Sequence, residues 1–276
     1  MYRNINATTD NCNLNVVYMK YLGGKQRLGK KIAPILKDII ENSRSNGYRI
    51  KSYIEPFCGS LGVLRNMTDI DVPIHASDYH PDLISMWKDV RDGTFKYPTS
   101  ISEKQYLAAK SLPSPNSHKA FVGFGMSFGG RFFGAYSQKY LGDKKEDFCK
   151  EMTNSLKRTA PLIKDVSFDT LDYTTMNPSN SLIYCDPPYR ENKYPIKYRR
   201  DTKKYDKFDN DAFWEIMRDW SQNNIVVISE LSAPDDFTEI WHHDQSRSAS
   251  RSKNTKKNSN QMERLFIHES LLHMIV

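Results

Sequence analysis

The sequence predicts an α/β fold in which a Rossmann-like sheet is interrupted by a mostly helical insertion. Two observations predict the sheet: short apolar runs alternate with amphipathic segments, and several runs end in a glycine turn or an acidic residue. A third predicts the insertion, because the alternation stops between residues 93 and 162. We therefore expect a flexible N-terminal tail over 1–15, a main domain formed by 16–92 and 163–276, and an inserted domain over 93–162.

The composition indicates an intracellular protein with an anionic partner. The formal net charge of +7 favours nucleic acid or an anionic membrane surface. The four cysteines are far apart and form no CxxC pair, which argues against a zinc ribbon and against a secreted disulfide framework. We predict no metal site. The polar N-terminus is no signal peptide, and the short apolar ending over 265–276 is no membrane span. We therefore expect a soluble, intracellular protein.

The first predicted helix follows a turn that contains paired glycines. An apolar entry over 16–19 leads through the turn 20–25 into an amphipathic helix that starts near Leu28 and ends before Gly47. Pro34 predicts a kink in this helix. The glycine turn thus lies at a strand-to-helix junction.

The next segment predicts a nucleotide-binding unit. A strand over 52–54 enters a glycine turn over 55–62, and a helix is expected from Val63. A second strand over 73–78 ends in an acidic residue and precedes a helix over 81–90. In nucleotide-binding βαβ units with this order, the terminal acid binds ribose hydroxyls.

The remaining predicted elements fill the insertion and complete a seven-stranded sheet. In the insertion we expect helices at 102–112 and 144–162 around a stretch rich in Gly and Phe at 123–136. After it, we expect strands at 165–168, 182–185 and 225–229, a helix at 213–220, and an antiparallel ending at 264–268 and 271–276.

The strand at 182–185 stops at Asp186-Pro187-Pro188-Tyr189 because proline has no N–H to donate to a sheet. This places a carboxylate, prolyl carbonyls and an aromatic ring at the carboxyl edge, where open α/β folds bind ligands. Asp186 and the Pro187 carbonyl can accept both N–H groups of an adenine amine, which frees its lone pair to attack a sulfonium methyl group, and Tyr189 can stack on the extruded base. An ordinary strand-to-loop turn remains an alternative.

Three other features are weaker candidates for ligand binding. The small residues of the turn 55–62 allow close approach to a ligand, although an ordinary strand-to-helix turn looks similar. Asp78 is either a ribose ligand or a helix cap. Lys25 lacks the sequence context of a P-loop lysine but can pair with a ligand carboxylate. A fourth stretch, 123–130, lacks the strand and acid of a dinucleotide fingerprint. The Gly-Gly-Arg-Phe-Phe run at 129–133 suits either a core or a DNA-reading loop.

Two basic stretches follow predicted strands. Residues 187–207 contain eight Lys or Arg and three acids, with tyrosines interleaved, and 247–257 contain five basic residues and no acid. Solvated surface loops are the alternative, but the tyrosines and the position favour nucleic-acid binding.

Taken in order, these motifs resemble DNA adenine methyltransferases of the Dam type over 18–268. The segment 18–25 resembles the family's N-terminal cofactor motif, 53–59 its glycine loop, 76–78 its ribose-binding acid, 127–136 its recognition hairpin, 186–189 its catalytic signature, and 247–257 with 262–267 a family loop and late strand. The resemblance implies a Rossmann-like S-adenosylmethionine-dependent methyltransferase sheet with an inserted, mostly helical target-recognition domain. The implied activity is site-specific methylation of adenine N6 in double-stranded DNA.

The resemblance also implies roles for individual residues. The implied catalytic residues are Asp186, Pro187, Pro188 and Tyr189. Those implied to bind S-adenosylmethionine are Tyr21, Gly23, Gly24, Lys25, Glu55, Pro56, Phe57, Cys58, Gly59, Ser60, Asp78, Asp172 and Asp186. Those implied to bind DNA are Phe128, Gly130, Arg131, Phe132, Tyr136, Lys193, Lys197, Arg199, Arg200, Arg251 and Lys253.

The chain departs from the family pattern at three positions. Leu61 stands where the glycine loop usually has its second glycine, Tyr21 stands where relatives often have Trp, and Glu230 stands where they commonly have Asn. Two alternatives stay open: methylation of an amine on cytosine or RNA, and an inactive DNA-binding relative. A monomer or weak dimer is expected, and a cognate restriction endonuclease is compatible with the resemblance.

Overall fold

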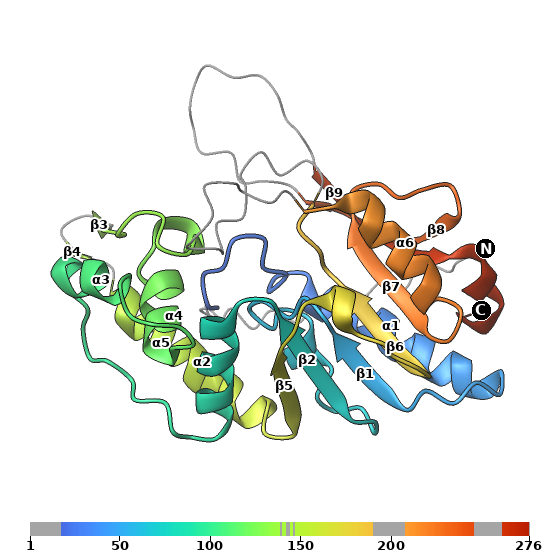
Figure 1. The fold of residues 1–276 in the computed structure, drawn as a ribbon, viewed down its shortest axis with the longest axis horizontal. Coiled ribbons are helices and arrows are strands. Elements are labelled where there is room, and N and C mark those ends of the chain that lie inside the picture. Colours follow the sequence, from blue (N-terminus) through green and yellow to red (C-terminus); the bar gives the residue numbers. More distant parts are fainter. Residues whose placement is uncertain are drawn as a thin grey trace, which may run out of the picture.

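The computed structural model describes residues 18–138, 140–141, 144–145, 147–189, 208–245 and 261–275, and a seven-stranded mixed sheet forms its centre (Figure 1). In chain order the strands are β1 (Ser52–Glu55), β2 (Ile74–Asp78), β5 (Val166–Thr170), β6 (Ser181–Cys185), β7 (Ile225–Glu230), β8 (Phe237–Gln245) and β9 (Gln261–His268). They lie in the order β5-β2-β1-β6-β7-β9-β8, with β9 antiparallel to both β7 and β8 and the other pairings parallel. The predicted α/β fold is confirmed.

Helices cover both faces of this sheet (Figure 1). Apolar residues of α1 (Gly29–Ser45) and α2 (Pro81–Arg91) share a core with one face, and those of α6 (Asn210–Trp220) share a core with the other. Strand β6 shows the reason: Leu182 and Tyr184 face the α1 side, whereas Ile183 and Cys185 face the α6 side. A strand that is buried on both faces reads as a continuous apolar run, and the sequence of β6 has this form.

The segment between α2 and β5 contributes three helices and, among its described residues, no strand to the main sheet. It contains α3 (Glu103–Ala109), α4 (Ser117–Gly125), α5 (Phe148–Thr159) and a two-stranded ribbon of β3 (Tyr140–Leu141) and β4 (Lys144–Lys145). The helix predicted over 144–162 is shorter, because the Asp147 side chain accepts a hydrogen bond from the Lys150 N–H and caps α5. Phe121 and Phe124 of α4 lie in the same core as α1, and the predicted domain boundaries stay predictions.

Several other predicted elements are wrong. After the glycine turn the chain forms only a 3₁₀ turn, η1 (Leu64–Asn66), in place of the helix expected from Val63, because 66–71 contain residues that compete with helical hydrogen bonds. Residues 18–20 form no strand. The α1 helix continues through Pro34, and the kink predicted there stays a prediction.

The C-terminal end of the sheet also differs from the prediction. The last strand was expected at 271–276, but the chain there forms the short helix α7 (Leu272–Ile275), whose last carbonyl accepts a hydrogen bond from Asn42 of α1. The strand that the sequence did not predict is β8, which lies at the edge of the sheet. Its mostly polar sequence and the register shift between Glu239 and Trp241 hide the alternation that marks a strand. Within the described residues, no helix combines the length and the apolar character that a membrane crossing requires.

Candidate active site

The predicted site residues follow strands that point in the same direction. β1 ends at Glu55, β2 ends at Asp78, and β6 ends one residue before Asp186. These strands are parallel neighbours, so their carboxyl ends meet at one edge of the sheet. The sheet therefore brings together side chains from three separate sequence motifs.

Lys25 joins the N-terminal turn to the Asp-Pro-Pro-Tyr loop. Its Nζ donates to Asp186 Oδ1 over 2.8 Å and also donates to the Tyr189 hydroxyl, although about 160 residues of sequence separate Lys25 from both. The Lys25 side chain is only 8% exposed. Because a buried ammonium is costly without a partner, this pairing fixes the two segments relative to each other.

The sequence reasoning missed a second buried acid, Glu263 on β9. Its Oε1 lies 3.6 Å from Lys25 Nζ and accepts hydrogen bonds from Ser229 of β7 and from the Tyr189 hydroxyl. Glu263 is 3% exposed. We call Lys25, Asp186, Tyr189, Ser229 and Glu263 the Lys25 cluster. An acid in the apolar strand 262–267 was the available signal, because buried acids are rare unless paired.

Tyr189 points into this cluster. Its hydroxyl contacts Lys25, Ser229 and Glu263, and the Lys25 ammonium lies 4.4 Å from the centre of its ring. Stacking on a base would require the Tyr189 side chain to leave these partners, so that predicted role stays a prediction.

Burial and charge determine the protonation of the cluster. Burial raises the pKa of Asp186 to about 6, although the Lys25 charge opposes this shift. Burial lowers the pKa of Lys25, but the negative charges of Asp186 and Glu263 outweigh it and hold the pKa above its ordinary value. At neutral pH the cluster thus contains a carboxylate at Asp186 and an ammonium at Lys25.

Two further acids lie at the same edge of the sheet. Burial raises the pKa of Glu55 to about 8, against the hydrogen bond that it accepts from the Tyr53 hydroxyl over 2.6 Å. Burial likewise raises the pKa of Asp78 to about 6, against two hydrogen bonds from backbone N–H groups. An acid whose ionised form is disfavoured in this way gains from a nearby cation, so this edge suits a positively charged ligand.

The glycine turn forms the wall beside Asp78. Gly59 has φ +46° and donates its N–H to Asp78 Oδ2 over 3.1 Å. A Cβ at Gly59 would lie 3.1 Å from the Tyr21 ring, so a side chain would displace this ring. Leu61, the departure from the family pattern, keeps φ +58° while its side chain is fully buried. The left-handed backbone of a glycine is therefore retained without the glycine.

Gln26, which the sequence reasoning also missed, ties the N-terminal turn to the glycine turn. Its Nε2 donates to the Ser60 hydroxyl and to the Met19 carbonyl. No sequence pattern marked it, because a glutamine after a lysine is ordinary at a helix start.

Other predicted cofactor residues lie away from the Lys25 cluster or have structural partners. The Asp172 side chain accepts hydrogen bonds from the Thr174 N–H and hydroxyl, which caps a 3₁₀ turn, η4 (Tyr173–Thr175), beyond β5. Phe57 packs on the α6 side against Tyr173, Phe208 and Phe213. Pro56 and Cys58 are buried, Gly23 is exposed with φ +81°, and Gly24 is half-buried.

The predicted DNA-contacting residues of the insertion differ in exposure. Phe128 is 76% exposed, and Arg131 is partly exposed. The ring of Phe132 packs against those of His80 and Phe124, and the Tyr136 hydroxyl donates to the Ile101 carbonyl.

Gly130 is buried, has φ +70°, and leaves no room for a side chain against the backbone of Lys20 and Tyr21. The remaining six, Lys193, Lys197, Arg199, Arg200, Arg251 and Lys253, lie outside the described residues. The predicted tail over 1–15 does as well.

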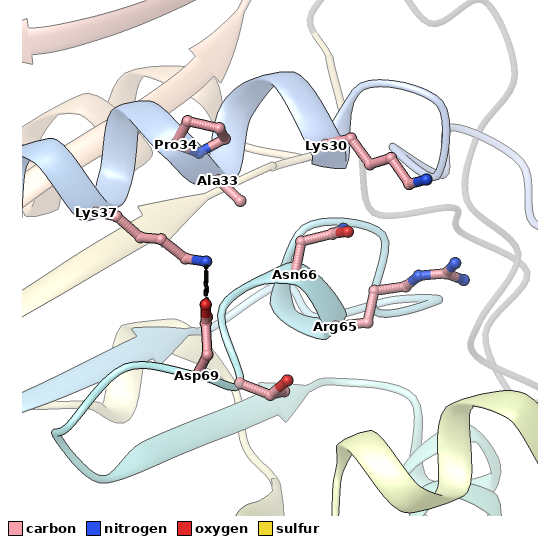
Figure 2. Close-up of a pocket in the computed structure, with 8 residues that line it drawn as sticks. Lys30, Ala33, Pro34, Lys37, Arg65, Asn66 and Asp69 are labelled. Atoms are coloured by element: carbon pink, nitrogen blue, oxygen red, sulfur yellow. Dashed lines mark hydrogen bonds and ion pairs between the residues drawn. The ribbon is translucent and has the colours of Figure 1, made fainter. Parts of the chain in front are cut away.

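A separate pocket of about 490 Å³ lies between α1 and η1 (Figure 2). It shares no residue with the Lys25 cluster. We place the candidate active site at the Lys25 cluster, because buried acids with shifted pKa values mark chemistry better than volume does.

Part of the chain matches a known protein family. Residues 21–122 match the family of D12 class N6 adenine-specific DNA methyltransferases. The matched segment contains Lys25, the glycine turn and Asp78, and it ends before the Asp-Pro-Pro-Tyr loop. No curated protein matches the chain. The family match confirms the predicted resemblance to Dam-type enzymes and the prediction of an adenine-specific DNA methyltransferase.

Proposed function

We propose that this protein transfers the methyl group of S-adenosylmethionine to N6 of an adenine that is extruded from double-stranded DNA. The observation that carries the proposal is the contact of Lys25, inside the family match, with Asp186 and Tyr189, outside it. Because one buried ammonium connects the two segments, the catalytic signature belongs to the same site as the matched cofactor motifs.

The residues at the carboxyl edge fit this cofactor. When bound, S-adenosylmethionine supplies a methyl group on a positively charged sulfur. Glu55, Asp186 and Glu263 carry three carboxyl groups, whereas Lys25 is the cation among them, so a second cation is favoured. Gly59 allows close approach beneath the Tyr21 ring. Asp78 is the last residue of β2, the position at which an acid binds ribose in related folds.

Asp186 has the central chemical role. As a carboxylate it accepts one N–H of the adenine amine, and the Pro187 carbonyl accepts the other. With S-adenosylmethionine bound, the amine nitrogen would take the methyl group and the cofactor would leave as its neutral thioether. Asp186, which accepts the N–H hydrogen bond, would be placed to take the proton that the nitrogen loses. A pKa of about 6 keeps Asp186 ionised at neutral pH. It also lies near the working pH, where a general base accepts protons most effectively.

Nucleoside analysis tests this function. The protein is incubated with radiolabelled S-adenosylmethionine and unmethylated duplex DNA, and the digested DNA is separated into nucleosides. We expect label in N6-methyladenine, and a loss of about 1,000-fold or more with Asp186→Ala. Asp38→Ala, at an exposed aspartate of α1, is the matched control and should retain activity.

Three outcomes would reject the proposal. Label on cytosine or only on RNA would establish a different amine substrate. If the wild-type protein neither bound S-adenosylmethionine nor labelled the DNA, it would be an inactive DNA-binding relative. Undiminished label with Asp186→Ala would remove the assigned role of the carboxylate.

A further inference from the structure

The pocket between α1 and η1 has an uneven charge distribution. We call it the basic pocket and define it by Lys30, Lys37, Arg65, Asn66 and Asp69. At one end Lys37 is neutralised by Asp69, with Nζ 2.6 Å from Oδ1. Figure 2 shows Lys30 and Arg65 away from this pair. In the part of the chain that the structure describes, neither has a carboxylate within ion-pair distance.

Arg65 is held in place rather than extended into solvent. Its guanidinium carbon lies 4.4 Å from the centre of the Tyr18 ring, and the side chain is partly buried. Burial lowers the pKa of Arg65, and the charge of Arg158 on α5 lowers it further, against the influence of Tyr18. An anion beside the partly buried guanidinium of Arg65 would offset this unfavourable charge.

The chemistry of the pocket fits phosphate. A guanidinium forms paired hydrogen bonds to phosphate oxygens, and an ammonium adds a point charge. The Asn66 amide is oriented by its hydrogen bond to the Gly62 carbonyl and is a further polar group of the lining. Lys30, Pro34 and Asp69 are exposed, so the pocket is open to solvent and accessible to a polymer backbone.

The position of the pocket connects it to DNA. Lys30 lies in the first turn of α1, five residues after Lys25, and Arg65 lies in η1 directly after the glycine turn. Both therefore start from the carboxyl edge of the sheet, on its α1 side. We propose that Lys30 and Arg65 bind one phosphate of the DNA backbone at this edge, outside the catalytic cluster. The inference rests on the proposed function, because that function brings DNA to the edge.

Salt-dependent DNA binding tests the phosphate site. Full-length protein is titrated with fluorescent duplex DNA over a range of salt concentrations, and log Kd is plotted against log salt. Each phosphate contact contributes about 0.9 to the slope, so Arg65→Gln and Lys30→Gln should each lower the slope by up to about 0.9 and raise Kd about three- to tenfold. Lys51→Gln is the matched control, because exposed Lys51 precedes β1 at the opposite edge of the sheet.

A charge-conserving variant separates binding from folding. Arg65→Lys should keep most of the slope, whereas loss of the slope in both Arg65→Gln and Arg65→Lys would indicate a packing role and overturn the proposal. A slope equal to that of wild type in Arg65→Gln would also overturn it. Because binding is measured without methyl transfer, a wild-type protein that binds DNA but labels no adenine would reject the proposed function alone.

Discussion

Two groups of charged residues lie close together along the N-terminal turn and α1, yet they differ in solvation. The Lys25 cluster is largely buried and pairs its ammonium with two acids, whereas the basic pocket is open and contains two cations without a described carboxylate partner. Desolvation strengthens each interaction in the cluster and makes every unpaired charge there expensive. Water screens the cations of the pocket, so their charge remains available to a partner.

The difference assigns separate tasks to two lysines five residues apart. Lys25 determines the protonation and position of groups that would touch the reacting atoms. Lys30 would contribute only to the affinity for DNA. The glycine turn and η1 stand between the two regions, since the turn contacts Tyr21 on one side and η1 lines the basic pocket on the other.

The same substitution in both regions gives the largest expected contrast. Lys25→Met leaves Asp186 and Glu263 buried near each other without their cation and should lower the free energy of unfolding by about 3–5 kcal/mol. Lys30→Met, at an exposed position, should change it by less than about 0.5 kcal/mol. Urea denaturation near neutral pH measures both values.

Activity profiles sharpen this contrast. Without Lys25 the pKa of Asp186 should rise, because its opposing cation is lost, and the acid limb of the pH–rate profile should move to higher pH. Lys30→Met should leave the limb in place. Equal losses of stability in the two variants would contradict the assignment of Lys25 to a desolvated cluster.

The sequence predicted the main sheet better than its surroundings, for a physical reason. The strands around β6 are buried on both faces, so their apolar runs are visible in the sequence, and Asp186 and Asp78 mark their ends. Edge strand β8 has no such run and was missed.

Tertiary contacts across the sheet were not predictable in the same way. Glu263 enters the candidate site because β9 lies beside β7, which places it near Ser229, and no local pattern contains that pairing. The pairing of Lys25 with Asp186 was also not predicted, although both residues were proposed as site residues from their motifs. Local rules identify strand ends, whereas the assembly of a cluster depends on strand order.

The buried acids predict a pH dependence of stability that the basic pocket lacks. The pKa of Glu55 is raised from 4.5 to about 8, so between these values the folded protein holds a proton that the unfolded chain has released. Stability should therefore fall as pH rises through this window, by up to about 1.4 kcal/mol per pH unit from this group. Asp78 and Asp186 should add a similar fall between 3.8 and about 6.

Glu55→Gln isolates the largest of these contributions. The amide oxygen can still accept the Tyr53 hydroxyl bond, but the side chain no longer titrates, so stability above pH 6 should decline less steeply than in wild type. Unfolding free energies at several pH values measure the slope. Glu103→Gln, at an exposed glutamate of α3, should keep the wild-type slope. An unchanged slope in Glu55→Gln would contradict the raised pKa.

The smallest predicted effect is the difference in stability between two variants of Leu61, which lies in the turn between the two regions. Its φ of +58° costs about 1–2 kcal/mol for a residue with a Cβ, whereas burial of its side chain contributes about 2–5 kcal/mol. Burial outweighs strain, which explains how leucine is tolerated where the family has glycine. Leu61→Ala should therefore lose most of this burial and keep the strain.

Leu61→Gly loses the same packing but removes the strain. At an ordinary position glycine is less stable than alanine by about 0.5–1 kcal/mol, and here the relief of strain should cancel or reverse that difference. Chemical denaturation of the two variants measures it directly. A Gly variant less stable than the Ala variant by about 1 kcal/mol would show that the turn does not hold Leu61 in the left-handed region, and that the wall between the Lys25 cluster and the basic pocket has another backbone path.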